Sequence, residues 1–152
     1  MVVSAWNVEQ LDQMALVPCH YSFQFVVTGD TNGNPKYLNC LVNMRSTDTF
    51  LGAPYNANSY GMLTHIIAHI TGLTANTLSI SMADCHLYET HIEQAKKMIS
   101  RKPYRFPTLD FSEKIKSVQD ITIDDFAYKF DLSDYIVSEY VHHPYIKAEM
   151  AI

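Results

Sequence analysis

Hydrophobic and polar residues alternate in two stretches near the start of the chain, residues 21–28 and residues 37–45. Because a period of two places successive side chains on opposite faces of a strand, both stretches are predicted to be half-buried strands. The residues between them, Gly29-Asp30-Thr31-Asn32-Gly33-Asn34-Pro35, are types that favour turns. We therefore predict a β-hairpin whose second strand ends at Arg45.

Two later stretches carry apolar residues at helical spacing. In residues 56–71 these residues lie three and four positions apart, and Gly72 follows as a stop signal. Residues 90–100 have one apolar side and end before Lys102-Pro103. The pattern predicts a largely buried helix followed by an amphipathic one.

Further strands are predicted at residues 78–82, where apolar and polar residues alternate, and at residues 107–111, which begin with a proline. Residues 117–130 are ambiguous between a strand and a short helix, and we favour the strand. The tail from His142 is predicted to be irregular. Since strands and helices alternate without a repeat or linker, we expect one α+β domain over residues 1–152.

Length and composition support one core. The chain has 152 residues, 47% of them hydrophobic, and a net charge of −5 that argues against broad nucleic-acid binding. Its three cysteines, Cys19, Cys40 and Cys85, have no CxxC spacing and indicate reduced thiols in the cytoplasm. No apolar run approaches the roughly 18 residues of a membrane span, so we expect no membrane association.

Pro18-Cys19-His20 opens the first predicted strand and places a thiol where it can react. Cys19 is a candidate nucleophile, whereas Cys40 and Cys85 are expected to be inert, buried small hydrophobes. Arg45 is the candidate that favours the thiolate, and its guanidinium can also hold a phosphate in bidentate fashion. The plainer alternative for Arg45 is a solvated charge. His20 is expected to face elsewhere and not to act as the base of Cys19.

Five motifs follow one another along the chain: Trp6-Asn7, Pro18-Cys19-His20, Arg45-Ser46-Thr47-Asp48, Leu51-Gly52-Ala53-Pro54-Tyr55-Asn56 and Asp84-Cys85-His86-Leu87-Tyr88. In order and spacing they resemble the thymidylate synthase family, and the resemblance runs from Ser4 to Ile152. It implies a mixed β-sheet packed against helices, with the other face of the sheet forming a homodimer. It also implies a methyltransferase that converts dUMP to dTMP with 5,10-methylenetetrahydrofolate.

The resemblance implies a substrate role for several residues. Cys19 would add to C6 of uracil, and Arg45 with Ser46 would bind the phosphate. Asn56 would read uracil N3–H and O4 through its amide, although an asparagine there can also cap a helix. Where related deoxycytidylate hydroxymethylases carry aspartate, Asn56 favours deoxyuridylate.

His86 and Tyr88 would bind the deoxyribose, because residues two apart on a strand face the same side. Their alternative is hydrogen bonding within the core. Asp84 is expected to be structural, orienting the neighbouring backbone. Gln24, on the strand after Cys19, completes the expected substrate-binding residues.

The resemblance implies a second group of residues that contact folate. Asp48 would face the folate, or else cap the coming turn. Gly52 would let the flat pterin approach the backbone. Ala151 and Ile152 would belong to a C-terminal lid over the cofactor, for which the alternative is a frayed terminus.

No metal site is expected. His65 and His69 have a spacing that can bind zinc. However, no glutamate follows His65 as in HExxH, and no third ligand is indicated.

The sequence departs from the family at Met44, where glutamine is common, at Ala83 in place of glycine, and at Glu149 in place of proline. Ala83 matters if the backbone there needs a positive φ. The family's proton-transfer glutamate, a cofactor-contacting tryptophan and the arginines that reach the partner's phosphate all precede the match to Met1. We therefore expect the C-terminal catalytic portion of the domain. Two explanations for the missing portion stay open: a separately encoded N-terminal piece as a partner, or a shortened chain.

Two alternatives stay open. One is a dUMP or dCMP hydroxymethyltransferase of the same superfamily, in which water rather than hydride completes the reaction. The other is a non-catalytic fragment that only folds with, or dimerises onto, a complete subunit.

Overall fold

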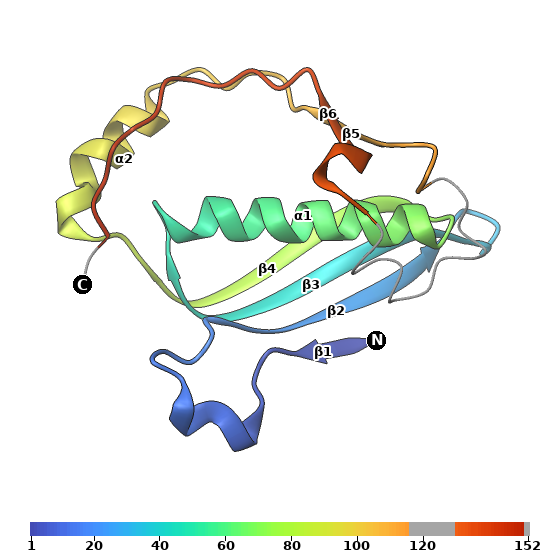
Figure 1. Cartoon of the computed structure of the whole chain (residues 1–152), viewed down its shortest axis with the longest axis horizontal. Coiled ribbons are helices and arrows are strands. Elements are labelled where there is room, and N and C mark those ends of the chain that lie inside the picture. The colour runs from blue at the N-terminus through green and yellow to red at the C-terminus, as the bar shows by residue number, and fades with distance from the viewer. Residues whose placement is uncertain (116–129, 151–152) are drawn as a thin grey trace.

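The structure is a computed structural model that describes residues 1–115 and 130–150. It consists of a four-stranded sheet, one long helix on one face of this sheet, and an arch of shorter elements beyond that helix (Figure 1). This confirms the predicted α+β class. The prediction for residues 117–130 lies outside the described residues, except for Phe130.

The main sheet is mixed. Its strands are β1 (Val2–Ser4), β2 (His20–Gly29), β3 (Pro35–Asp48) and β4 (Thr74–His86), in that spatial order. β2 runs antiparallel to β1 and to β3, whereas β3 and β4 are parallel and connected through the long helix. The parallel pair brings the carboxyl ends of β3 and β4 to the same edge of the sheet.

β2 and β3 form the predicted hairpin, and its turn explains the choice of residues. Oδ1 of Asp30 accepts hydrogen bonds from the amides of Asn32 and Asn34 at 2.8 and 3.1 Å. These amides lower the pKa of the Asp30 carboxyl. Gly33 has a φ of 83°, which favours glycine. Local chemistry therefore fixes this turn, as the sequence indicated.

The long helix α1 (Gly52–Ile70) covers one face of the sheet. Its Tyr60 packs with the buried β3 residues Cys40, Val42 and Met44, which are 0 to 3% exposed. Met44 is thus a core residue. Burial raises the pKa of the Cys40 thiol, which supports the expectation that Cys40 is inert.

α1 begins four residues before its predicted start. Gly52 and Pro54 both lie in the first turn of α1, where proline is tolerated. Oδ1 of Asp48 accepts the amides of Phe50 and Leu51 at 2.9 and 3.2 Å, which closes the turn leading into α1. The alternative interpretation of Asp48 as a turn cap describes this contact.

The remaining elements form the arch beyond α1. They are a 3-10 turn η2 (Glu89–His91), helix α2 (Ile92–Ile99), and an antiparallel pair of β5 (Thr108–Phe111) and β6 (Tyr135–Ser138). α2 and β5 confirm the predicted helix at residues 90–100 and the predicted strand at residues 107–111. The sequence did not predict β1, β6 or the 3-10 helices η1 (Val8–Gln13) and η4 (Leu132–Asp134). The predicted irregular tail is confirmed for residues 142–150.

A groove of about 950 Å³ lies between α1 and the arch. Met62 and His65 line it from α1, and Phe106, Val137 and Tyr140 line it from the other side. Phe106 is 92% exposed and Tyr140 is 64% exposed. This side of α1 is therefore less covered than the side that packs on the sheet.

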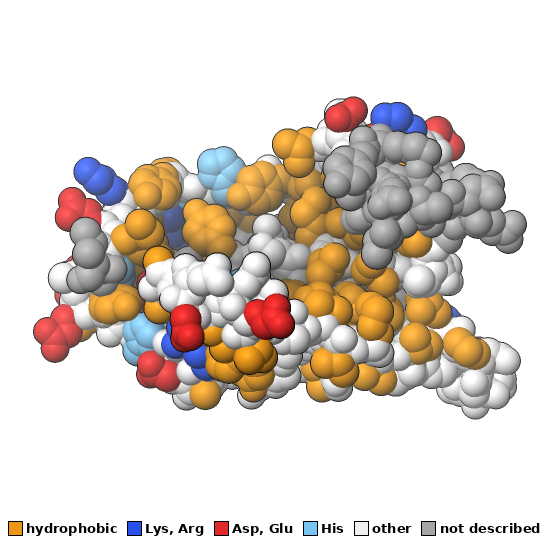
Figure 2. Space-filling model, turned by 60° about the horizontal axis from the view of Figure 1, so that its bottom comes forward, with side chains coloured by type: hydrophobic (Ala, Val, Ile, Leu, Met, Phe, Trp, Pro, Cys, Tyr) orange, Lys and Arg blue, Asp and Glu red, His pale blue; other side chains and the backbone are white. Residues whose placement is uncertain are grey.

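The sheet face turned away from α1 is largely polar. Nδ2 of Asn39 donates to the carbonyl of Val26 and to the hydroxyl of Thr28, and Asn76 donates to Oδ1 of Asn39 at 2.8 Å. Leu41 on the same strand is 37% exposed. Figure 2 brings the lower side of Figure 1 forward and shows hydrophobic side chains interspersed with polar ones.

Candidate active site

Cys19 lies immediately before β2 and is partly exposed as a free thiol. The backbone N–H of Arg45 donates to the carbonyl of Cys19 at 2.9 Å. The indole Nε1 of Trp6 donates to the carbonyl of Pro18 at 3.0 Å. Two hydrogen bonds from distant parts of the chain therefore hold the backbone that presents the thiol.

The guanidinium of Arg45 lies beside the same loop. One terminal nitrogen donates to the carbonyl of Val17 at 2.6 Å. Nε of Arg45 is buried and has no hydrogen-bond partner within residues 1–115 and 130–150. A buried charged donor without an acceptor is costly, and an anionic oxygen would satisfy it. The structure thus places a guanidinium with one unsatisfied donor beside Val17, which is two residues before the candidate nucleophile.

His20 points to α1. Its Nδ1 lies 2.8 Å from the hydroxyl of Tyr60, and the two rings meet edge to face. Burial raises the pKa of Tyr60, so this hydroxyl stays protonated near neutral pH. The contact accounts for the orientation of His20. That His20 does not act as the base of Cys19 stays a prediction.

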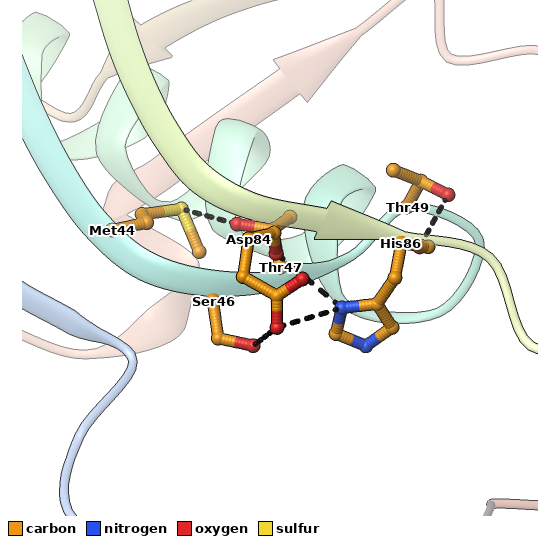
Figure 3. A network of polar contacts seen from close by, with 6 residues as sticks. All are labelled: Met44, Ser46, Thr47, Thr49, Asp84 and His86. Carbon is orange, nitrogen blue, oxygen red and sulfur yellow. Dashed lines mark hydrogen bonds and ion pairs between the residues drawn. The ribbon is translucent and has the colours of Figure 1, made fainter.

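The adjoining ends of β3 and β4 form a polar network (Figure 3). The hydroxyl of Ser46 donates to Oδ2 of Asp84 at 3.2 Å, and Nδ1 of His86 lies 3.6 Å from the same oxygen. The register explains this, since Ser46 is paired with Asp84 across the parallel strands. Asp84 therefore orients two candidate substrate-binding side chains, a more specific role than the sequence indicated.

β4 reaches this network without a strained backbone. Among the described residues other than glycine, only Glu139 has a positive φ, so Ala83 fits where the family carries glycine. Cys85 is exposed, and the expectation that it is buried was wrong. Cys85 lies on β4, which is the edge strand of the four-stranded sheet.

His86 and Tyr88 lie side by side, as expected, but only His86 belongs to the strand. β4 ends at His86, and Tyr88 is the residue before η2. Their rings meet edge to face with centroids 5.1 Å apart. Because Tyr88 keeps an extended backbone, the alternation of side chains continues past the end of β4.

Asp48, Gly52 and Asn56 lie together at the start of α1. A Cβ on Gly52 would lie 3.6 Å from Cβ of Asp48 and 3.9 Å from Oδ1 of Asn56. The missing side chain therefore leaves a hollow between a carboxylate and an amide. Asn56 is inside the helix and not its cap, because Leu51 occupies the cap position.

Comparison with known proteins identifies the family and the fold. The sequence model of thymidylate synthase matches residues 1–152. The chain belongs to the thymidylate synthase family. The structure of thymidylate synthase from T4 phage superimposes with a TM-score of 0.81 at 36% sequence identity. The match covers 99% of this chain and 52% of that chain, so the present chain spans about half the length of the phage enzyme.

Not every residue expected from the thymidylate synthase resemblance joins the site. Gln24 lies in the middle of β2, and its neighbours Phe23 and Phe25 pack into the core beneath α1. Gln24 therefore points to the opposite face of the sheet. Ala151 and Ile152 lie outside the described residues.

Sequence reasoning missed His91, which the family comparison does not single out either. This side chain is 1% exposed, and its Nε2 lies 2.7 Å from the carbonyl oxygen of Glu149. In the sequence, His91 fell within a predicted amphipathic helix. Only the fold brings it to the C-terminal tail.

His65 and His69, the α1 histidines whose spacing could suit zinc, have different surroundings. His69 stacks on Phe111 with centroids 4.2 Å apart, and its Nε2 is buried without a hydrogen-bond partner among the described residues. His65 lines the groove beside α1. Residues 1–115 and 130–150 contain no cluster of three potential metal ligands, and none of their helices is long and apolar enough to cross a membrane.

Proposed function

We propose that this chain supplies the nucleophile and the nucleotide-binding half of a thymidylate synthase. The observation that supports this most is the unpartnered Nε of Arg45 beside the loop that presents Cys19. A guanidinium in that position can hold a phosphate dianion and favour the thiolate. The substrate would be dUMP, and the product would be dTMP.

Cys19 performs the covalent step. Its thiolate forms a bond to C6 of the uracil, and the electron pair of the C5–C6 double bond moves to C5. C5 then bonds to the one-carbon unit and gives its proton to solvent, and the bond between the one-carbon unit and the folate nitrogen breaks. The Cys19–C6 bond breaks last and restores the double bond. When bound, 5,10-methylenetetrahydrofolate supplies the one-carbon unit and the hydride that completes the methyl group, leaving dihydrofolate.

Most of the proposed substrate contacts come from residues near the carboxyl ends of β3 and β4. Arg45 and Ser46 bind the phosphate, and Ser46 frees its hydroxyl from Asp84 by rotating about its Cα–Cβ bond. His86 and Tyr88 bind the deoxyribose. Asn56 reads the uracil edge from α1. A contribution from Gln24 would require the substrate, or a second chain, to reach the outer face of the sheet.

The hollow at Gly52 is proposed to receive the folate ring. A Cβ there would be in van der Waals contact with Asp48 and Asn56, so glycine leaves this position open to a group of the ligand. Asp48 uses one carboxylate oxygen for the turn amides, which leaves the other for a ligand N–H. Ala151 and Ile152 are proposed to cover the folate from the C-terminal tail.

Activity is proposed for this chain when it is completed by the other portion of the family fold. That portion is proposed to cover the apolar side chains of the groove beside α1, and two copies are proposed to associate through the outer face of the sheet. The chain has about half the length of the phage enzyme, so a second polypeptide segment is needed to fill out that fold. A cytoplasmic location fits the reduced thiols.

Complementation tests this proposal. The chain is mixed with the N-terminal portion of thymidylate synthase from T4 phage, and dihydrofolate formation is followed with dUMP and methylenetetrahydrofolate. We expect dTMP by mass, activity lost in Cys19→Ser, and activity retained in Cys85→Ser, which changes an exposed thiol. A folded complex that makes no product contradicts the proposal, and a hydroxymethylated nucleotide identifies the alternative hydroxymethyltransferase.

A further inference from the structure

Among the histidines of the described residues, His91 is the most buried, at 1% exposed. Its ring contacts Phe50 and Tyr88, with centroid separations of 5.5 and 5.7 Å. Phe50 belongs to the turn closed by Asp48, and Tyr88 meets His86 edge to face. His91 therefore contacts Tyr88, a candidate site residue, and Phe50, which lies in the turn next to Asp48.

One hydrogen bond connects His91 to the C-terminal tail. The acceptor is the backbone carbonyl of Glu149, so Nε2 of His91 must carry the proton. Nδ1 is buried without a hydrogen-bond partner among the described residues. A second N–H on the ring would be a buried donor without an acceptor, which is unfavourable. The contact therefore requires a ring proton on Nε2 and leaves Nδ1 without a partner among the described residues.

The tail is also tied at its other end. Arg101 donates to the carbonyl of Pro144 at 2.8 Å, and Nε2 of His143 lies 2.8 Å from the carbonyl of Lys102. Figure 1 shows the tail running beside this segment and then beside α2. Within the described part of the chain, no hydrogen bond other than that of His91 reaches residues 145–150.

Between these ties the tail spans a hollow. A cavity of about 550 Å³ lies there, lined by Gln94 of α2 and by Lys147 and Met150 of the tail. Met150 is 80% exposed. Tyr145 is 79% exposed, whereas Ile146 and Ala148 are partly buried. Packing therefore holds this segment only in part, and the imidazole hydrogen bond adds to it.

We propose that His91 is a positioning residue that tethers the C-terminal tail to the strand end bearing His86 and Tyr88. Loss of the tether frees residues 145–150 without dismantling the sheet. The catalytic consequence rests on the proposed function: a released tail raises KM for methylenetetrahydrofolate more than it lowers kcat. The tether itself exists whether or not the chain takes part in thymidylate synthesis.

Hydrogen exchange of the chain without substrates tests the tether. His91→Phe keeps a ring against Phe50 and Tyr88 but removes the donor, whereas His91→Gln keeps a donor. We expect exchange of the amides in residues 145–150 to rise roughly three- to tenfold in His91→Phe and to stay near wild type in His91→Gln. Unchanged exchange in His91→Phe, or equal release in both variants, overturns the proposal. Exchange in β2 and β3 reports whether each variant is folded.

A second measurement requires no substitution of a buried side chain. Nitrogen NMR of the unaltered chain identifies the His91 tautomer, and a chain ending at Ala148 removes the acceptor carbonyl. We expect a slowly exchanging proton on Nε2 that exchanges faster after truncation, with no change in Glu149→Ala, which keeps the carbonyl. A proton on Nδ1, or indifference to truncation, overturns the tether even if the His91 variants fail to fold.

Discussion

The hydroxyl of Tyr60 lies 2.8 Å from Nδ1 of His20 and so joins the middle of α1 to the first residue of β2. Because His20 directly follows Cys19, this contact also fixes the backbone that carries the thiol. Tyr60 is 7% exposed, so water is poorly placed to replace its hydroxyl.

Tyr60→Phe should destabilise the fold by about 1 to 2 kcal/mol, because the partly buried His20 nitrogen loses its partner while ring packing is retained. Chemical denaturation measures the change in free energy of unfolding. Tyr55→Phe is the matched control, since Tyr55 is 73% exposed on the same helix, and it should shift stability by less than about 0.5 kcal/mol. Equal effects of the two substitutions would show that the contact with His20 contributes nothing.

Arg45→Lys should weaken binding of dUMP by about tenfold or more. A lysine lacks the planar fork that can bond both the Val17 carbonyl and a phosphate. Isothermal titration of the complemented protein with dUMP measures this loss. Arg105→Lys, in an exposed loop, should bind normally, and an equal loss there would show that the weakening does not depend on the position of Arg45.

Asn56→Asp should shift the base preference from deoxyuridylate towards deoxycytidylate. A carboxylate presents acceptors only, whereas uracil N3–H and O4 require one acceptor and one donor. The ratio of kcat/KM for the two nucleotides should change by about tenfold or more. Asn58→Asp adds the same charge at an exposed position of the same helix; a matching shift in that variant would mean that Asn56 does not read the base.

Stability at acid pH should depend on Asp134. A hydrogen bond from the Ser112 hydroxyl, joined by the Asp131 amide and by Lys114, holds the pKa of this carboxyl below its ordinary range. The folded chain therefore binds fewer protons than the unfolded chain below about pH 5, so stability falls as the pH falls through this region.

Thermal melting between about pH 5 and pH 3 measures this dependence. Asp134→Asn should flatten it and lower the melting temperature at the upper end. Ser112→Ala, which removes the largest cause of the pKa shift, should have a smaller effect in the same direction. A slope that is identical in all three proteins would assign the acid sensitivity to other carboxyls.

The sequence predicted the elements that carry their own local pattern. The hairpin was recognisable from alternation and from the turn around Asp30, and α1 from its apolar spacing. β1 and β6 were missed because they have only three and four residues and exist through pairing with distant partners. The start of α1 was missed because Asp48 closes the turn from outside the helix.

The site was predictable as a set of residues but not as a network. The motifs indicated Arg45, Ser46 and His86, yet no spacing rule connects Ser46 to Asp84 or His91 to Glu149. Those contacts depend on the strand register and on the path of the tail. These side-chain contacts therefore follow from long-range pairing in the fold, which the local sequence pattern does not determine.

The parallel pairing of β3 and β4 also restricts how the length of this chain can vary among its relatives. Ser46 faces Asp84, and Asp48 faces His86, through one unbroken register. One residue inserted between Leu78 and Met82 would move Asp84 and His86 together to the other face of the sheet, away from Ser46 and Asp48. Insertions should accumulate instead in the hairpin turn and after Gly72, so that gaps in related sequences will mark the loops and spare the two strands.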